Sequence, residues 1–330
     1  MQIGIGGWKP ISAMEVDKLG YGDCKGLTNY TKSLLEIANV PAYYSIIYAG
    51  GSQRDIDENF TSLQGNHVIL GVPNEDEMIW LECTSQKIPF GFLGDFTDDR
   101  DALMVTPEGG KIVHTASYGP SDNKLLTEGN CVLDMDGTIS VDVTMDSWGV
   151  QYDSRYTNIS EKEKDQKQFY RNYWDYIDNI TIESMDFEND KRKVKLSERL
   201  KFKAASYTSI AGDKVIFNVN VLNRSTYIPK RYKNRKQPLY LSRGYLDEDN
   251  VLIIIPSGYQ LEGLPEPIEV ASSFGNYVSR ITDNGDGTLS YSRTFQLLEG
   301  VYPKEEYKNY RSFRKKIAKS DNQKLIFTKK

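Results

Sequence analysis

The hydrophobic pattern of the chain changes near Gly119, and this change limits the folds that the chain can adopt. Before that point, segments with helical three- and four-residue spacing alternate with short apolar runs, which predicts a mixture of helices and strands. After it, most apolar segments repeat with a period of two and are separated by turn residues. At 330 residues, the chain also exceeds what one hydrophobic core usually serves. We therefore expect two domains, residues 1–118 and residues 119–330.

Composition and charge exclude several classes of protein. Lys and Arg number 41 against 46 Asp and Glu, a net charge of −5, whereas nucleic-acid binders usually show a strongly basic domain. The longest apolar runs, such as residues 251–256, are far shorter than the roughly 20 residues that span a bilayer. Three cysteines and two histidines never fall into CxxC or HxxxH spacing. We expect no nucleic acid, no membrane span, no disulfide framework, no metal and no cofactor.

Residues 24–40 form the clearest predicted helix in the first part. Its apolar residues share one face, Asp23 is placed to cap its start, and Pro41 ends it. This puts Cys24 in the first helical turn. Strands are predicted at residues 43–48, 67–72 and 78–82, the last two joined as a hairpin by the turn residues 73–77.

The segment after Gly119 predicts a mostly antiparallel β-sandwich with one or two helices, so that the whole chain is of the α+β class. Residues 134–137 form a hairpin turn, and Ser160–Glu163 has the form of a capping box ahead of a helix. A second helix is predicted at residues 303–318. The basic run Lys230–Lys236 either grips an anionic partner or forms a solvated loop.

Cys24 and His67 are the residues in which nucleophilic chemistry is most plausible. A thiol is nucleophilic only as the thiolate, which free backbone N–H groups and the dipole at a helix start stabilise. The competing interpretation is that Cys24 is a small buried hydrophobic residue. Downstream, His67 begins one predicted strand and Glu82 ends the next. Neighbouring antiparallel strands can place an imidazole beside a carboxylate, the arrangement that a cysteine nucleophile requires.

The run from Ile3 to about Pro89 resembles the transglutaminase-like family, specifically bacterial members whose core lies between β domains. The blocks that carry the resemblance are Gly4–Pro10, Tyr21–Gly26, Asn66–Val68 and Trp80–Thr84. The C-terminal part resembles the β domain that follows this core in such proteins. Its marks are Ile254–Tyr259, Leu264–Pro265 and the Tyr291–Arg293 strand ahead of Glu305–Tyr307.

The resemblance implies a cysteine-protease-type core with a papain-like triad. Cys24 would be the nucleophile, His67 the base and acid, and Glu82 the orienting carboxylate, where many members have Asp. The Cys24 N–H would stabilise the oxyanion, with Trp8 or Gln2 as a second donor. Attack on an amide carbonyl through a thioester, followed by transfer to water or an amine, implies a peptidase, amidase or acyl transferase with a peptide or protein substrate.

The sequence also leaves open a second class of function, in which the protein is not an enzyme. A binding or scaffold module that keeps the fold without turnover would act in envelope protein or glycan interaction. The presence of all three triad residues favours the enzyme. The resemblance further implies a periplasmic or cell-envelope location in a bacterium and an additional β domain that precedes residue 1.

Overall fold

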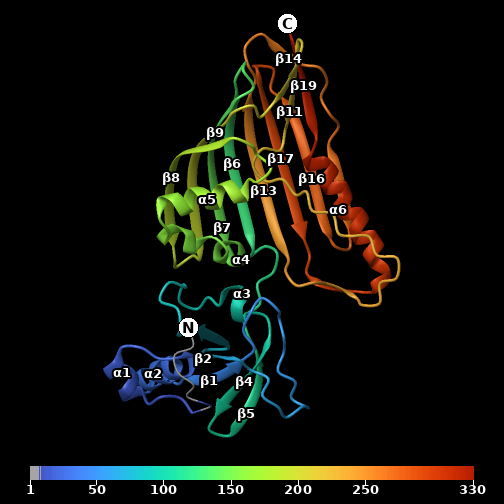
Figure 1. Cartoon of the computed structure of the whole chain (residues 1–330). Helices are drawn as coiled ribbons and strands as arrows, with labels where there is room; N and C mark the ends of the chain where they lie inside the picture. Colours follow the sequence, from blue (N-terminus) through green and yellow to red (C-terminus); the bar gives the residue numbers. More distant parts are fainter. Residues whose placement is uncertain (1–6, 8) are drawn as a thin grey trace. The chain divides into compact units, whose positions relative to one another are not determined.

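The computed structural model describes residue 7 and residues 9–330. The chain divides into two compact units between Tyr118 and Gly119, with residues 191–194 grouped with the first unit. The described residues form a mixed α/β fold with mostly antiparallel sheets and six α-helices (Figure 1). This confirms the expected combination of helices with mostly antiparallel strands. Gln2 and Trp8, the predicted oxyanion donors, lie outside the described residues.

The first unit contains a five-stranded antiparallel sheet of order β3-β2-β1-β4-β5, and α2 packs against β1 and β2. Its core holds the buried side chains of Ile47, Ile69 and Trp80. Its elements are α1 (Ala13–Leu19), α2 (Cys24–Ile37), β1 (Tyr43–Ile47), β2 (His67–Asn74), β3 (Glu77–Leu81), α3 (Gly94–Thr97), β4 (Asp101–Thr106) and β5 (Gly109–His114).

The start of α2 follows the predicted capping chemistry. The Asp23 carboxylate accepts a hydrogen bond from the Gly26 N–H at 2.9 Å, which satisfies one of the backbone donors that a helix start leaves free. One turn after Cys24, the hydroxyl of buried Thr28 donates to the Val68 carbonyl at 3.2 Å. Because Val68 follows His67 directly, this bond fixes the start of α2 against the start of β2.

The second unit is built on an eight-stranded sheet of order β15-β16-β17-β13-β6-β7-β9-β8. Strands β13 and β6 pair in parallel, and the other neighbours in this sheet are antiparallel. Its strands are β6 (Lys124–Leu133), β7 (Ile139–Trp148), β8 (Ile180–Asp190), β9 (Lys195–Ala204), β13 (Tyr245–Ile254), β15 (Ile268–Ser272), β16 (Gly275–Asp283) and β17 (Thr288–Leu297).

A four-stranded sheet of order β10-β11-β19-β14 shares one hydrophobic core with the eight-stranded sheet. Phe217 and Phe327 of the smaller sheet belong to the same buried cluster as Val141 and Phe202 of the larger one. This packing is consistent with the predicted β-sandwich. The remaining strands are β10 (Ser209–Ala211), β11 (Lys214–Asn218), β14 (Tyr259–Leu261) and β19 (Lys324–Lys329), with β12 (Leu239–Leu241) paired to β18 (Gly300–Tyr302).

The helices of the second unit differ from the prediction in their number and in the cap at the start of one helix. Its described residues form three α-helices rather than one or two: α4 (Gly149–Asp153), α5 (Glu163–Tyr173) and α6 (Tyr307–Asp321). The capping box at Ser160–Glu163 is wrong, because Ser160 ends a short 3₁₀ helix and its hydroxyl donates to the Thr157 carbonyl. Across residues 7 and 9–330, no helix is both long and apolar enough to cross a membrane.

Candidate active site

Three elements of the first unit bring the predicted triad residues together. Cys24 lies in the first turn of α2, His67 begins β2, and Glu82 follows directly after β3. His67 Nε2 lies 2.8 Å from Glu82 Oε2, a hydrogen-bonding distance. On its other side, the His67 imidazole hydrogen-bonds the Cys24 thiol. The imidazole therefore lies between a thiol and a carboxylate, as the strand pairing predicts.

The electrostatics of this group favour charge separation between sulfur and ring. The hydrogen bond from His67 lowers the pKa of the Cys24 thiol below its ordinary value of 9.0, against the opposing effect of burial. Burial alone would lower the pKa of His67, but its hydrogen bonds to Cys24 and Glu82 outweigh this and raise it to about 9. Both shifts favour a thiolate beside an imidazolium, the state in which a cysteine is nucleophilic.

Glu82 is fixed by groups of its own loop. Its Oε1 accepts hydrogen bonds from the Thr84 backbone N–H at 2.9 Å and from the Thr84 hydroxyl. Burial would raise the pKa of Glu82, but the bonds to His67 and Thr84 lower it below its ordinary value. The carboxylate therefore stays ionised and keeps its second oxygen directed at the ring of His67.

An aromatic ring shields the imidazole from one side. The Phe96 ring meets the His67 ring edge-on, with 5.4 Å between ring centroids. The Phe96 carbonyl accepts a hydrogen bond from the Gly50 N–H at 2.9 Å. The fully buried Arg100 guanidinium donates to the Gly50 carbonyl at 3.1 Å and to the Asp95 carbonyl at 3.1 Å. A buried cation thus holds the backbone on both sides of the shielding ring.

A cavity of about 220 Å³ opens beside the sulfur. A side chain at Gly65 would place its Cβ 2.3 Å from Ile46, so the backbone can approach β1 only because this residue is glycine. Asn66 bonds both backbone groups of Ala49, its oxygen accepting from the N–H at 2.7 Å. The cavity is lined by Gly7, Cys24, Lys25, Tyr44, Ile46, Gly65, Asn66, His67 and Val68.

The other two cysteines lie in environments that disfavour the thiolate. Burial raises the pKa of Cys131 to about 12, and Cys131 belongs to the core of the second unit. Burial also raises the pKa of Cys83, although hydrogen bonds with Thr31 and Thr28 of α2 oppose it. The Cys83 side chain therefore points toward α2.

His114 forms a separate cluster with carboxylates at the end of β5. Its Nδ1 lies 2.7 Å from Asp101 Oδ1 and its Nε2 lies 3.2 Å from Asp99 Oδ1. Among the residues that the structure describes, Asp55, Asp101 and His114 form the group whose donor atoms come within 4.8 Å of one another, the spacing of a metal site. Both nitrogens of His114 already have carboxylate partners, so the group is accounted for as a hydrogen-bonded cluster.

Several residues of the site were missed from the sequence. Thr28 has a signal in principle, because a hydroxyl four residues after Cys24 lies on the same face of the helix. Thr84 lies within the Trp80–Thr84 block, but its bonds to Glu82 depend on a loop conformation that no spacing rule predicts. Phe96 comes from a segment distant in sequence, and only the folded chain brings it to His67.

Comparison with known proteins gives two findings. A family model described as a domain of unknown function with a solved structure, DUF3858, matches residues 213–327. Among solved structures, the chain is similar to a "putative protease" from Parabacteroides distasonis ATCC 8503, with a TM-score of 0.52 and 13% sequence identity. That match covers 99% of this chain and 48% of the other, so the chain spans about half the length of that protein. No curated protein matches the chain. At this identity, the likeness is one of fold.

Proposed function

We propose that the chain is a thiol-dependent hydrolase or acyl transferase of the transglutaminase-like type that acts on amide bonds of peptides or proteins. Cys24 is the nucleophile, His67 the base and acid, and Glu82 the carboxylate that orients the imidazole. The observation that carries the proposal is the placement of His67 between the Cys24 thiol and Glu82, 2.8 Å from the latter.

The proposed reaction begins with attack of the Cys24 thiolate on the amide carbonyl, which forms a tetrahedral oxyanion. The Cys24 backbone N–H, free of a helical partner in the first turn of α2, supplies one donor to that oxyanion. As the C–N bond breaks, the His67 imidazolium gives its proton to the leaving amine, and a thioester remains on sulfur. Water or an amine, deprotonated by neutral His67, then attacks the thioester, releases the acyl group and restores the Cys24 thiolate beside the His67 imidazolium.

Alkylation by iodoacetamide tests the nucleophile directly. Cys24 should be labelled rapidly at pH 6, because its pKa is lowered below the ordinary value of 9.0 and only the thiolate reacts. Peptide mass spectrometry separates the three cysteines, and Cys83 and Cys131 serve as internal references because their pKa values are raised. The label should appear on Cys24 first by a wide margin.

The two histidines offer a matched pair of variants for this experiment. His67→Ala should abolish the labelling of Cys24 at pH 6, whereas His114→Ala should leave it unchanged, because His114 bonds Asp99 and Asp101 instead. Equal labelling of Cys24 in all three proteins would overturn the thiol enzyme and favour a binding module that keeps the fold.

A further inference from the structure

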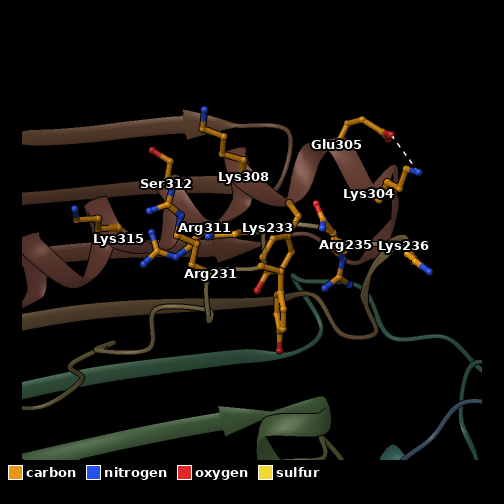
Figure 2. A pocket seen from close by; sticks show the side chains of 13 residues that line it. Arg231, Lys233, Arg235, Lys236, Lys304, Glu305, Lys308, Arg311, Ser312 and Lys315 are labelled. Atoms are coloured by element: carbon orange, nitrogen blue, oxygen red, sulfur yellow. Dashed lines mark ion pairs between the residues drawn. The ribbon is translucent and has the colours of Figure 1, made fainter.

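A cluster of cations lies along one face of α6 and the turn before it, in the second unit. Lys308, Arg311 and Lys315 follow one another at three- and four-residue steps, and Lys304 extends the row beyond the helix start. At a rise of 1.5 Å per residue, this row is roughly 16 Å long. Figure 2 shows these side chains along the same stretch of helix.

A second row of cations faces the first from the loop before β12. It consists of Arg231, Lys233, Arg235 and Lys236, the basic run whose role the sequence left open. The two rows line a groove of about 1120 Å³ (Figure 2). The structure thus converts a charged loop into one wall of a two-sided basic groove.

The two walls are fixed to each other by hydrogen bonds. The Tyr307 hydroxyl donates to the Lys230 carbonyl at 2.6 Å, and Arg311 Nε donates to the Pro229 carbonyl at 2.9 Å. The Arg235 guanidinium lies over the Tyr307 ring, 4.4 Å from its centroid. The groove is therefore formed before any ligand arrives, which reduces the entropic cost of binding.

Almost none of the positive charge in the groove is neutralised by nearby carboxylates. Lys304 lies 3.9 Å from Glu305, and in residues 7 and 9–330 the other seven cations of the two rows have no carboxylate within ion-pair distance. Like charges held side by side repel one another, and an anionic ligand would relieve that repulsion. The ligand must therefore carry several negative charges along its length.

The lining favours a peptide over a nucleic acid. Of the two aromatic residues that line the groove, Tyr307 has its ring face covered by Arg235, which leaves the single ring of Tyr232, whereas grooves for single strands stack successive bases. Glu305 and Asn234 also line the groove, and their side-chain oxygens are acceptors that the N–H groups of a peptide backbone can use. In addition, the net charge of −5 repels long polyanions at a distance.

We propose that this groove binds an acidic segment of a partner protein in an extended conformation. At about 3.3 Å per residue, roughly five residues fit along the row on α6. Carboxylates on alternate residues point to the same side of an extended chain and repeat about every 6.6 Å, close to the four-residue step of the helix. The proposal does not depend on the catalysis proposed for Cys24.

Fluorescence anisotropy with a labelled peptide of alternating Glu and Ser tests the groove in the full-length chain. The peptide should bind at 50 mM NaCl and more weakly at 200 mM, whereas the analogue with Gln in place of Glu should not bind. Lys308→Glu with Lys315→Glu should weaken binding by about tenfold or more. Lys316→Glu with Lys319→Glu, on the same helix but outside the groove, should change it by less than about twofold.

Three results would overturn the proposal. The first is equal binding of the Glu and Gln peptides, and the second is equal weakening by the two pairs of substitutions, with circular dichroism showing that all variants are folded. The third is tighter binding of an oligonucleotide or an acidic polysaccharide of the same charge, which would make another polyanion the ligand. Because Cys24 is unchanged in every variant, its alkylation tests the enzyme separately.

Discussion

His67 has a hydrogen-bonding partner on each side, so its protonation reports on the whole site. Its pKa is raised from 6.5, and this contribution to stability is fully present below pH 6.5 and is lost as the pH rises through about 9. The pKa of Glu82 is lowered from 4.5, so its contribution is present above pH 4.5 and is lost as the pH falls through its folded value. Both contributions are complete between pH 4.5 and 6.5.

Glu82→Gln should shift the titration of His67 from about 9 toward 6.5, because the neutral amide no longer stabilises the imidazolium. Proton NMR of the ring C–H signals measures this directly in a chain with two histidines. The signal of His114 should titrate as before, since its partners are Asp99 and Asp101. An unchanged midpoint for His67 would show that Glu82 does not govern the ring.

The pH dependence of turnover should differ between amides and esters. With a peptide nitroanilide, the proposed mechanism predicts that the rate falls above about pH 9, because His67 would then lack a proton to give to the leaving amine. With a nitrophenyl ester, whose leaving group needs no proton, the rate should stay level there. A parallel fall for both substrates would contradict the role of His67 as the acid.

At the scale of elements, the start of α2 positions Cys24, the proposed nucleophile, and the cap of this helix can be removed by substitution. Asp23→Ala should destabilise the first unit by about 1 kcal/mol, because the Gly26 N–H loses its acceptor. Asp23→Ser keeps an acceptor oxygen and should restore most of the loss. Urea denaturation measures the effect, and equal stability of the Ala and Ser variants would show that the cap is irrelevant.

Local chemistry explains which elements could be predicted from the sequence. Asp23 acts through a neighbour three residues away, so its cap is visible in the sequence and is present in the structure. Ser160 has the same local pattern, but a 3₁₀ turn takes its hydroxyl, and α5 begins after Lys162 without a side-chain cap. The short α4 begins at Gly149 with a φ of 58°, where a Cβ would lie 2.5 Å from the Asp122 carbonyl, a contact with a segment distant in sequence.

The same distinction holds for the candidate site. His67 and Glu82 meet because two consecutive strands form a hairpin, a relation that alternation and turn residues predict. Phe96 lies in the short α3 and Arg100 just after it, and the contacts of Arg100 depend on backbone carbonyls that no residue pattern marks. Likewise, the basic loop before β12 gains its second wall only when α6 packs beside it.

At the scale of the whole molecule, one buried cation joins three elements of the second unit. Arg293 of β17 lies 2.6 Å from Asp249 of β13 and 3.1 Å from Asp321 of α6. Arg293→Leu should lower the free energy of unfolding by about 3–5 kcal/mol, because two buried carboxylates lose their partner.

Arg199 provides the control for that measurement. It also contacts two carboxylates, Asp186 and Glu188, but at the surface, where such pairs contribute little. Arg199→Leu should therefore leave the denaturation midpoint almost unchanged. Similar losses for both variants would contradict the importance of burial.

The parallel pairing of β6 with β13 has a consequence for synthesis on the ribosome. Leu125 lies opposite Asp247, so the centre of the largest sheet joins segments about 120 residues apart. At roughly 5–20 residues per second, the ribosome makes β13 about 6–24 s after it has made β6. During this interval, the edge of β6 that later pairs with β13 is open to other strands. Slowing translation between residues 134 and 244 should therefore increase the demand of the nascent chain for chaperones.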